Sequence, residues 1–202
     1  MTEYQFTKDW FNWAPEVWKQ LVPHLSGTAG HRQFLEIGSF EGRSSVWIAE
    51  NMMQDGDILR CIDTWEGGEE HKADSEDMGE VEERFRSNLM VANEKFPRRR
   101  IIQSKGTSVR ELSRWLQQDK TSFDFVYIDG SHIAKDVLTD ACMAWPLLKP
   151  KGLMVFDDYL WTPNARDILH RPKAAIDAFT NIFAEEAEIV HVGYQLIVRK
   201  RG

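Results

Sequence analysis

The chain has 202 residues, of which 42% are hydrophobic and 28% are charged, and its formal net charge is −7. This length allows one domain with a full hydrophobic core. The acidic balance argues against a nucleic-acid partner, and no apolar run is long enough for a membrane span. A polar N-terminus unlike a signal peptide, with Cys61 and Cys142 interpreted as reduced, buried thiols, predicts a cytoplasmic protein.

The first predicted elements are helices within residues 7–25, where large apolar side chains recur at helical spacing. Pro15 is expected to open the second of these helices, because proline is tolerated in the first helical turn. Two roles are open for this region, packing on a sheet or capping a substrate pocket. We expect residues 1–33 to form an N-terminal helical cap and residues 34–202 to form the main domain.

A glycine-containing turn at residues 34–44 (FLEIGSFEGRS) joins the first predicted strand to a helix. Gly38 and Gly42 let the backbone approach a ligand closely, and the helix N-terminus offers free N–H groups. Glu36 is a poor neighbour for a pyrophosphate but a good one for a cationic or hydroxyl-bearing ligand. Alone, such a turn also fits an ordinary tight β–α connection.

The rest of the chain alternates predicted strands and helices. Further strands are expected at residues 57–63, 100–105, 123–129 and 153–158, each followed by a helix, and a terminal hairpin at residues 188–199. Residues 66–80 and 160–172 lack apolar periodicity and are predicted loops, the first a candidate active-site lid. The pattern predicts a doubly wound α/β domain.

Acidic side chains follow the predicted strands at one edge of the expected sheet. Ligands of open parallel sheets bind outside the carboxyl ends of the strands, where the strand order reverses. With the first and fourth strands adjacent, Gly38 and Asp129 flank that point. Asp63 is placed to accept hydrogen bonds from ribose hydroxyls. The acids are Glu36, Asp63, Asp129, Asp157 and Asp158, and each of them alone also fits a helix cap or a turn.

Three of these acids predict a metal site. Neighbouring strands lie about 4.8 Å apart, so Asp129 and the pair Asp157–Asp158 would reach one point. Unpaired carboxylates that close repel one another, and a divalent cation with oxygen ligands removes the repulsion. The alternative is a solvated turn. His132 is placed to accept a proton from a hydroxyl, or to cap the helix that follows it.

The segment LEIGSFEGRSS resembles motif I of the class I S-adenosylmethionine-dependent methyltransferases. It is most similar to the metal-dependent small-molecule O-methyltransferases, and IDGSH and FDDY look closer to the macrocin (macrolide-sugar) type than to the catechol type. The resemblance covers residues from about 34 to 200. It implies a Rossmann-like, mostly parallel seven-stranded sheet with an antiparallel last strand.

The resemblance also implies three sets of site residues. Trp65 is assigned to the adenine, although a core role suits it equally, and Thr107 and Ser108 match a segment that lines the adenine. The metal set is Asp129, Asp157 and Asp158, and the catalytic set is His132 and Asp129. The cofactor-binding set is Glu36, Gly38, Ser39, Gly42, Ser44, Asp63, Trp65, Thr107, Ser108 and Asp129.

The expected function is methyl transfer from S-adenosylmethionine to a hydroxyl of a small molecule (a sugar, phenol or natural product), assisted by Mg²⁺ or another divalent cation. The alternatives are a metal-independent methyltransferase of the same fold and a non-catalytic S-adenosylmethionine-binding module. A nicotinamide-dependent oxidoreductase is disfavoured because the spacing G-x-G-x-x-G is absent. No nucleic-acid or membrane partner is expected, and a homo-oligomer is compatible with the sequence.

Overall fold

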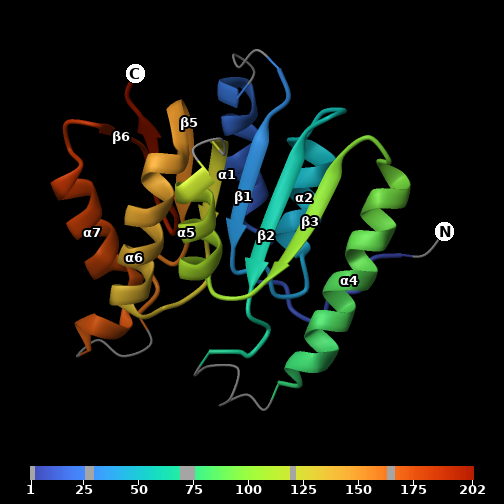
Figure 1. Cartoon of the computed structure of the whole chain (residues 1–202). Helices are drawn as coiled ribbons and strands as arrows, with labels where there is room; N and C mark the ends of the chain where they lie inside the picture. The colour runs from blue at the N-terminus through green and yellow to red at the C-terminus, as the bar shows by residue number, and fades with distance from the viewer. Residues whose placement is uncertain (1–2, 26–29, 69–75, 119–121, 163–166) are drawn as a thin grey trace.

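A computed structural model of the protein describes residues 3–25, 30–68, 76–118, 122–162 and 167–202. Seven strands form one sheet in the order β3-β2-β1-β4-β5-β7-β6 (Figure 1). The first five strands pair in parallel, and β7 runs antiparallel to both β5 and β6, as predicted. The strands are β1 (Gln33–Ile37), β2 (Ile58–Asp63), β3 (Arg100–Lys105), β4 (Phe123–Ile128), β5 (Leu148–Phe156), β6 (Ala187–Val192) and β7 (Leu196–Lys200).

Helices cover both faces of the sheet. Helices α1, α2 and α4 pack on one face of the sheet, and α5, α6 and α7 pack on the other. In Figure 1 α2 lies behind the sheet, α6 lies in front of it, and α4 stands at the right beside β3. The α-helices are α1 (Ala14–Leu21), α2 (Arg43–Asn51), α4 (Met78–Lys95), α5 (Ser108–Gln118), α6 (Ala134–Ala144) and α7 (Pro172–Ile182). Short 3₁₀ helices are η1 (Val22–Leu25), η2 (Trp145–Leu147) and η3 (Ile168–His170).

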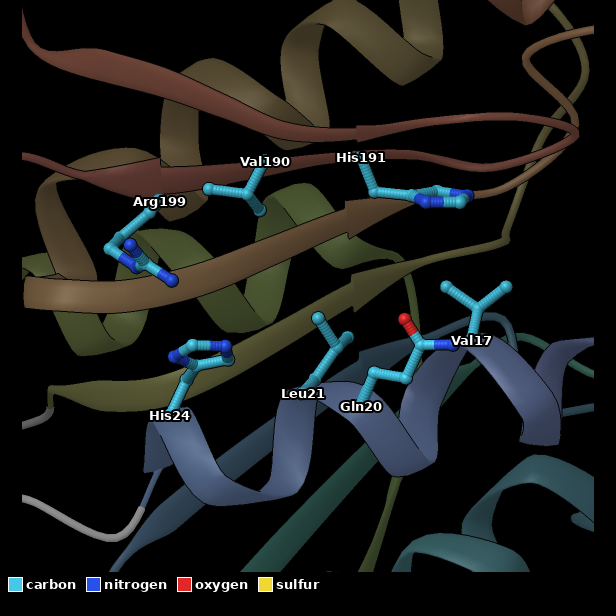
Figure 2. A pocket seen from close by; sticks show the side chains of 7 residues that line it. All are labelled: Val17, Gln20, Leu21, His24, Val190, His191 and Arg199. Atoms are coloured by element: carbon cyan, nitrogen blue, oxygen red, sulfur yellow. The ribbon is translucent and has the colours of Figure 1, made fainter.

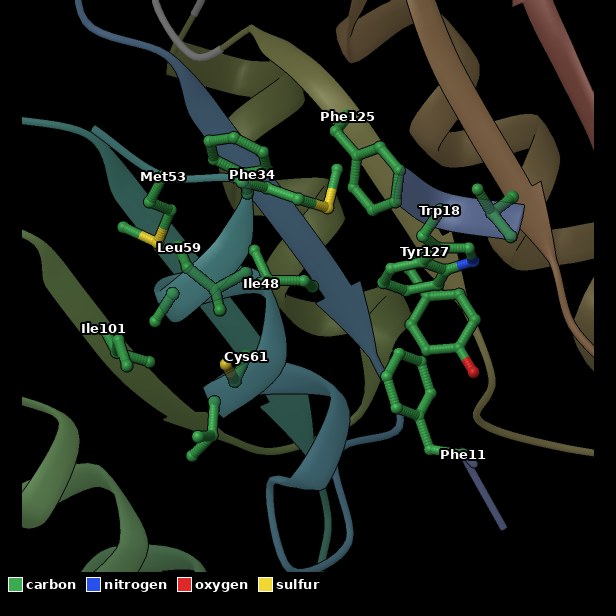
Figure 3. Packing of buried hydrophobic residues seen from close by; sticks show 14 of the residues in the cluster. Phe11, Trp18, Phe34, Ile48, Met53, Leu59, Cys61, Ile101, Phe125 and Tyr127 are labelled. Carbon is green, nitrogen blue, oxygen red and sulfur yellow. The ribbon is translucent and has the colours of Figure 1, made fainter. Parts of the chain in front are cut away.

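The centre of the sheet is buried on both faces. Every residue of β4 is buried, which explains its nearly continuous apolar sequence FDFVYI. Figure 3 shows one of the two buried clusters, in which Phe125 and Tyr127 pack against Trp18 of α1 and Phe34 packs against Phe125. Because the sheet is filled from both sides, its carboxyl edge is a rigid frame for a site.

The predicted first N-terminal helix is wrong, because no helix precedes Ala14 in the described residues 3–13. Side chains of other elements satisfy the backbone there. The Gln5 N–H donates to Oδ1 of Asn88 at 2.8 Å, and the Thr7 N–H donates to Oε2 of Glu41 at 2.6 Å. This segment therefore lies along α2 and α4 as an extended strap.

The second predicted helix is confirmed, with Pro15 in the first turn of α1. Its Trp18 has no exposed surface and meets the rings of Phe125 and Tyr127 edge-on. Packing on the sheet is thus observed for this helix. The boundary between residues 1–33 and 34–202, and a capping role over a substrate, stay predictions.

Three further expectations need correction. Helix α4 begins at Met78 because Asp77 caps it, so the predicted loop 66–80 ends earlier, and its residues 69–75 lie outside the described part. Strand β5 begins at Leu148 and includes the expected turn at residues 151–152. Cys142 is exposed, whereas Cys61 is buried as predicted. Among the described residues, no helix is long and apolar enough to cross a membrane.

Candidate functional site

The carboxyl ends of four neighbouring strands meet at one edge of the sheet. Backbone hydrogen bonds continue across these ends, so the residues that follow the strands are held side by side. They run from Gly38 N–H to Ile62 O (2.8 Å), from Asp129 N–H to Ile37 O (2.8 Å), and from Asp157 N–H to Ile128 O (3.0 Å). The predicted gathering of Asp63, Asp129 and Asp157 beside the glycine turn follows from this pairing.

Two glycines shape the turn between β1 and α2. Gly38 has φ +85°, and a Cβ there would lie 2.0 Å from the carbonyl oxygen of Asp129. Gly42 has φ +80° at the N-cap of α2, and a Cβ there would lie 2.9 Å from the Phe85 ring. Only glycine fits both the backbone conformation and the space. The turn thereby leaves the first N–H groups of α2 facing the sheet edge.

Glu36 lies beneath the turn and has no exposed surface. Its carboxylate accepts hydrogen bonds from the hydroxyls of Ser39 at 2.8 Å, Ser44 at 2.5 Å and Ser45. Burial raises the pKa of Glu36, and the three seryl hydrogen bonds oppose that rise. Sequence reasoning missed Ser45, although the Ser44–Ser45 pair at the start of a helix was the available signal. Glu36 therefore ties the turn to α2 from inside the core.

Asp63 holds the same turn from the side of β2. Its Oδ2 accepts the N–H groups of Ser39 at 2.8 Å and Phe40 at 3.0 Å, and its Oδ1 accepts the N–H of Trp65 at 2.8 Å. The residue is half-buried, and a carboxylate offers about four lone-pair sites. Oδ1 thus retains acceptor capacity for a hydroxyl of a ligand.

The structure favours the core role for Trp65. Its side chain is 4% exposed, packs against the Phe85 ring with centroids 4.7 Å apart, and donates its indole N–H to the Phe40 carbonyl at 2.9 Å. The segment after β3 lies nearby, because the Gly106 N–H donates to the Asp63 carbonyl at 2.9 Å. That segment carries the other two residues assigned to the adenine.

Those two residues differ in their surroundings. Thr107 is exposed at the rim of the sheet edge. Ser108 begins α5, and its hydroxyl hydrogen-bonds to the buried Asp140 of α6. Of the two, Thr107 is the residue more open to a ligand.

Asp129 and Asp157 share one hydroxyl group. The buried Tyr127 O–H lies 2.9 Å from Oδ2 of Asp129 and also contacts Oδ2 of Asp157. A hydroxyl carries one proton, so the two carboxyl groups compete for the same donor. Desolvation and the Asp157 and Asp158 charges raise the pKa of Asp129 well above its ordinary value. Because Asp129 as a residue is open to solvent, the charges of Asp157 and Asp158 are the stronger cause of this rise.

The same causes act on Asp157, whose pKa rises to about 6 through desolvation and the charge of Asp158. Its other oxygen, Oδ1, accepts the N–H of Asp158 at 2.8 Å. The Gln195 side-chain amide also donates to its Oδ2 at 3.2 Å. No sequence pattern indicates Gln195 or Tyr127 as a neighbour of the acids, since Gln195 lies in the terminal hairpin and Tyr127 lies inside a core strand.

Asp158 faces His132. Oδ2 of Asp158 lies 2.8 Å from Nε2 of His132, and Oδ1 accepts the Tyr194 hydroxyl at 3.0 Å. The His132 ring stacks on Trp161 with centroids 4.1 Å apart and an interplanar angle of 18°. Asp158 has φ +56°, a left-handed conformation that turns its side chain toward this pair. The predicted proximity of His132 to the acids is therefore observed.

The three acids are the ligand type that a hard divalent cation prefers, but their side chains are not positioned as a metal site. Three carboxylates supply the oxygen ligands that Mg²⁺, Ca²⁺ and Mn²⁺ prefer. Within the described residues, however, no three Asp, Glu, His or Cys side chains stand close enough together to hold a metal. Both oxygens of Asp158 are engaged by His132 and Tyr194. Each of these oxygens has one such partner, and a carboxylate offers about four lone-pair sites, so Asp158 keeps acceptor capacity for a cation.

A separate pocket lies between the N-terminal helices and the terminal hairpin (Figure 2). None of the predicted site residues is among the residues that line it. They are Val17, Gln20, Leu21, His24, Val190, His191 and Arg199. This pocket is therefore distinct from the acids at the sheet edge.

Comparisons with known proteins agree with this geometry. The family model described as a methyltransferase domain matches residues 35–159. No curated protein matches the chain by sequence. An O-methyltransferase from Bacillus cereus solved with SAH aligns with a TM-score of 0.64 and 20% identity, over 93% of this chain and 81% of that one.

Two natural-product enzymes are also similar in structure. TomG of Streptomyces achromogenes, an O-methyltransferase involved in tomaymycin synthesis and solved with SAM, has a TM-score of 0.64 and 20% identity over 91% of this chain and 77% of its own. MycE of the mycinamycin biosynthetic pathway, solved with Mg, SAH and mycinamycin VI, has a TM-score of 0.56 and 20% sequence identity. That match covers 98% of this chain and 51% of MycE, so this chain spans about half the length of MycE.

The matched residues begin in β1, include the glycine turn and Asp63, and end at Tyr159, directly after the acids that follow β5. More than half of the chain thus matches one family, and the sheet order is that of the fold. The protein therefore belongs to the methyltransferase domain family.

Proposed function

We propose that this protein transfers the methyl group of S-adenosylmethionine to a hydroxyl group of a small molecule, with a divalent cation assisting at the acids. The observation that carries the proposal is the position of the pair His132–Asp158 next to Asp129, across the sheet edge from the glycine turn. Cofactor and base would then face one reacting point. When bound, S-adenosylmethionine supplies an electrophilic methyl group.

The cofactor side rests on the glycine turn. Gly38 and Gly42 let the turn pack tightly against Asp129 and Phe85, and the turn so held would receive the methionine part of the cofactor. Asp63 uses its remaining acceptor capacity for ribose hydroxyls. Glu36, which is fully buried, acts through the turn by fixing Ser39 and Ser44. Thr107 stands at the adenine end.

The acceptor side rests on His132. Its imidazole receives the proton of the attacking hydroxyl, and the Asp158 carboxylate at 2.8 Å stabilises the imidazolium that forms. The Trp161 ring, stacked on the imidazole, limits its rotation. Holding the hydroxyl near the methyl group supplies most of the acceleration through proximity and orientation.

The cation would be held by Asp129, Asp157 and Asp158, and it would lower the pKa of the acceptor hydroxyl. The raised pKa of Asp129 supports this, because carboxylates that repel one another gain from a positive charge. MycE, solved with Mg and mycinamycin VI, gives a parallel for both the cation and a macrolide-type acceptor. A sugar, phenol or natural product is the acceptor class we propose, with the protein acting in the cytoplasm.

A second candidate is the metal-independent version of the same reaction. The observation that favours it is the direct contact of His132 with Asp158, which already forms a base without a cation. In that version Asp129 and Asp157 orient the acceptor through their shared hydroxyl partner.

The test is transfer of a radioactive methyl group from labelled S-adenosylmethionine to a panel of small phenols, sugars, macrolides and amines, with Mg²⁺ and with chelator. Transfer that requires Mg²⁺ supports the main proposal. Transfer that is equal in chelator supports the metal-independent version. Transfer only to amines would contradict both, because the proposal is specific to hydroxyl groups.

A further inference from the structure

A buried chain of hydrogen bonds links the N-terminal helix to the acids at the sheet edge. The indole N–H of Trp18 in α1 donates to Oε1 of Gln195 at 2.7 Å. The amide of Gln195 donates in turn to Oδ2 of Asp157 at 3.2 Å. Trp18 and Gln195 both have no exposed surface. The link therefore runs through the protein interior, where hydrogen bonds are strong and unpaired groups are costly.

The chemistry of tryptophan fixes the direction of this chain. An indole nitrogen can only donate, so Trp18 must face the oxygen of the Gln195 amide. The amide nitrogen then points to Asp157. If the amide were rotated by 180°, its NH₂ group would face the indole N–H of Trp18, and its oxygen would face the carboxylate of Asp157. Trp18 thus determines which end of Gln195 reaches the acid.

The tryptophan also fixes the position of the second partner of Asp157. The Trp18 ring meets the Tyr127 ring edge-on, with centroids 4.8 Å apart and an interplanar angle of 86°. Tyr127 presents its hydroxyl to both Asp157 and Asp129. Figure 3 shows Trp18 beside Tyr127. One side chain of α1 therefore contacts both neutral partners of Oδ2 of Asp157, Gln195 and Tyr127.

We propose that Trp18 and Gln195 are positioning residues, which orient the Asp157 carboxylate for the cation. Helix α1 then contributes to cation binding through Trp18. This inference rests on the proposed role of Asp157 in the reaction. Neither residue touches the cofactor turn, so the proposal predicts an effect on the acids that leaves cofactor affinity unchanged. A role for Trp18 in packing alone would predict no selective effect.

Three variants of the full chain separate these readings. Gln195→Met keeps an unbranched side chain of similar length and removes the amide. Trp18→Phe keeps an aromatic ring in the core and removes the indole N–H. Trp145→Phe is the matched control, because its indole N–H donates to Oε2 of Glu186 at 2.9 Å on the opposite face of the sheet.

Affinities for Mn²⁺ and for S-adenosylhomocysteine are measured by calorimetry for each variant. We expect Gln195→Met and Trp18→Phe to weaken Mn²⁺ binding about tenfold, as is usual when a partner of a metal ligand is lost. Trp145→Phe should bind Mn²⁺ as the wild type does, and S-adenosylhomocysteine affinity should be equal in all four proteins. Equal Mn²⁺ affinity in all four would overturn the proposal, as would an equal loss in Trp18→Phe and Trp145→Phe.

Crystal structures of the same variants keep the inference separate from the proposed function. If the wild type binds S-adenosylhomocysteine but no Mn²⁺, the cation part of the proposed function is wrong. The positioning role then depends on the Asp157 side chain, which should change rotamer in Gln195→Met and Trp18→Phe but not in Trp145→Phe. An unchanged Asp157 rotamer would refute it. If Gln195→Met does not fold, Trp18→Phe decides alone.

Discussion

The backbone of Gly38 lies so close to that of Asp129 that no side chain fits between them, since a Cβ at position 38 would be 2.0 Å from the Asp129 carbonyl oxygen. This contact joins the cofactor turn after β1 to the acids after β4. The distance between the cofactor turn and the acids is therefore determined by the pairing of β1 with β4.

The Gly38→Ala variant should therefore have a lower free energy of unfolding and a lower affinity for the cofactor. The strained φ and the clash with backbone together should cost about 3 kcal/mol or more of unfolding free energy. Gly30→Ala is the control, because Gly30 has a similar φ of +104° with nothing within 4 Å of its Cβ. Urea unfolding should give that control a loss of only about 1 kcal/mol. Equal losses in the two variants would contradict the close approach.

Asp63→Asn should weaken both the turn and the cofactor site. One of the two carboxylate oxygens becomes an NH₂ group facing backbone N–H donors, which should cost about 1–3 kcal/mol. We expect S-adenosylhomocysteine affinity to fall about tenfold for a loss near 1.4 kcal/mol. Asp55→Asn serves as the control, since Asp55 forms only an exposed pair with Arg98 at 3.4 Å. An Asp63→Asn variant with wild-type affinity would exclude Asp63 from the site.

Asp140 should make stability depend on pH. Desolvation raises the pKa of this carboxyl to about 6, and the Ser108 hydrogen bond opposes that rise. The folded state therefore holds the proton more tightly than the unfolded state, so stability falls as pH rises from about 4 to 6. Asp140→Asn should gain about 1–3 kcal/mol over the wild type at pH 7.5 and almost nothing at pH 4.

Thermal unfolding at both pH values tests this difference. The control is Asp177→Asn, since the Asp177 side chain is 44% exposed and pairs with Lys173 on the same helix. A gain for Asp140→Asn of equal size at pH 4 and pH 7.5 would show that the ionised carboxyl is not the cause.

Asp157→Ala should abolish measurable cation binding. Removing the hydrogen-bond partner of a metal-binding residue usually lowers metal affinity 10–100-fold. Removing the metal-binding residue itself should cost more, so we expect Mn²⁺ affinity to fall about 100-fold or more. Asp177→Ala should bind Mn²⁺ as the wild type does. Calorimetry at pH 7.5 measures both, and unchanged affinity in Asp157→Ala would remove that acid from the cation site.

The sequence predicted the parallel sheet and the gathered acids because both follow from periodic patterns. Buried strands such as residues 123–128 are continuous apolar runs, and their carboxyl ends must meet at one edge. The edge residues Gly38, Asp63 and Asp129 were therefore found without the structure. The matched family model confirms the fold class that these patterns indicated.

The contacts that tune the acids could not be predicted in the same way. Tyr127 lies in the core strand β4 and Gln195 in the turn before β7, and only three-dimensional packing brings their polar atoms to Asp157. The N-terminal strap was predicted to be helical because its apolar spacing fits a helix. Contacts of Thr7 with Glu41, far away in sequence, hold it extended instead.

The central claim is that the glycine turn of residues 38–42 binds S-adenosylmethionine. Titration of S-adenosylhomocysteine into the purified wild type and the Asp63→Asn variant, with Mg²⁺ and after chelation, tests it most directly. We predict micromolar affinity in the wild type, about tenfold weaker binding in the variant, and little dependence on Mg²⁺. No binding to the wild type in either condition would contradict the account.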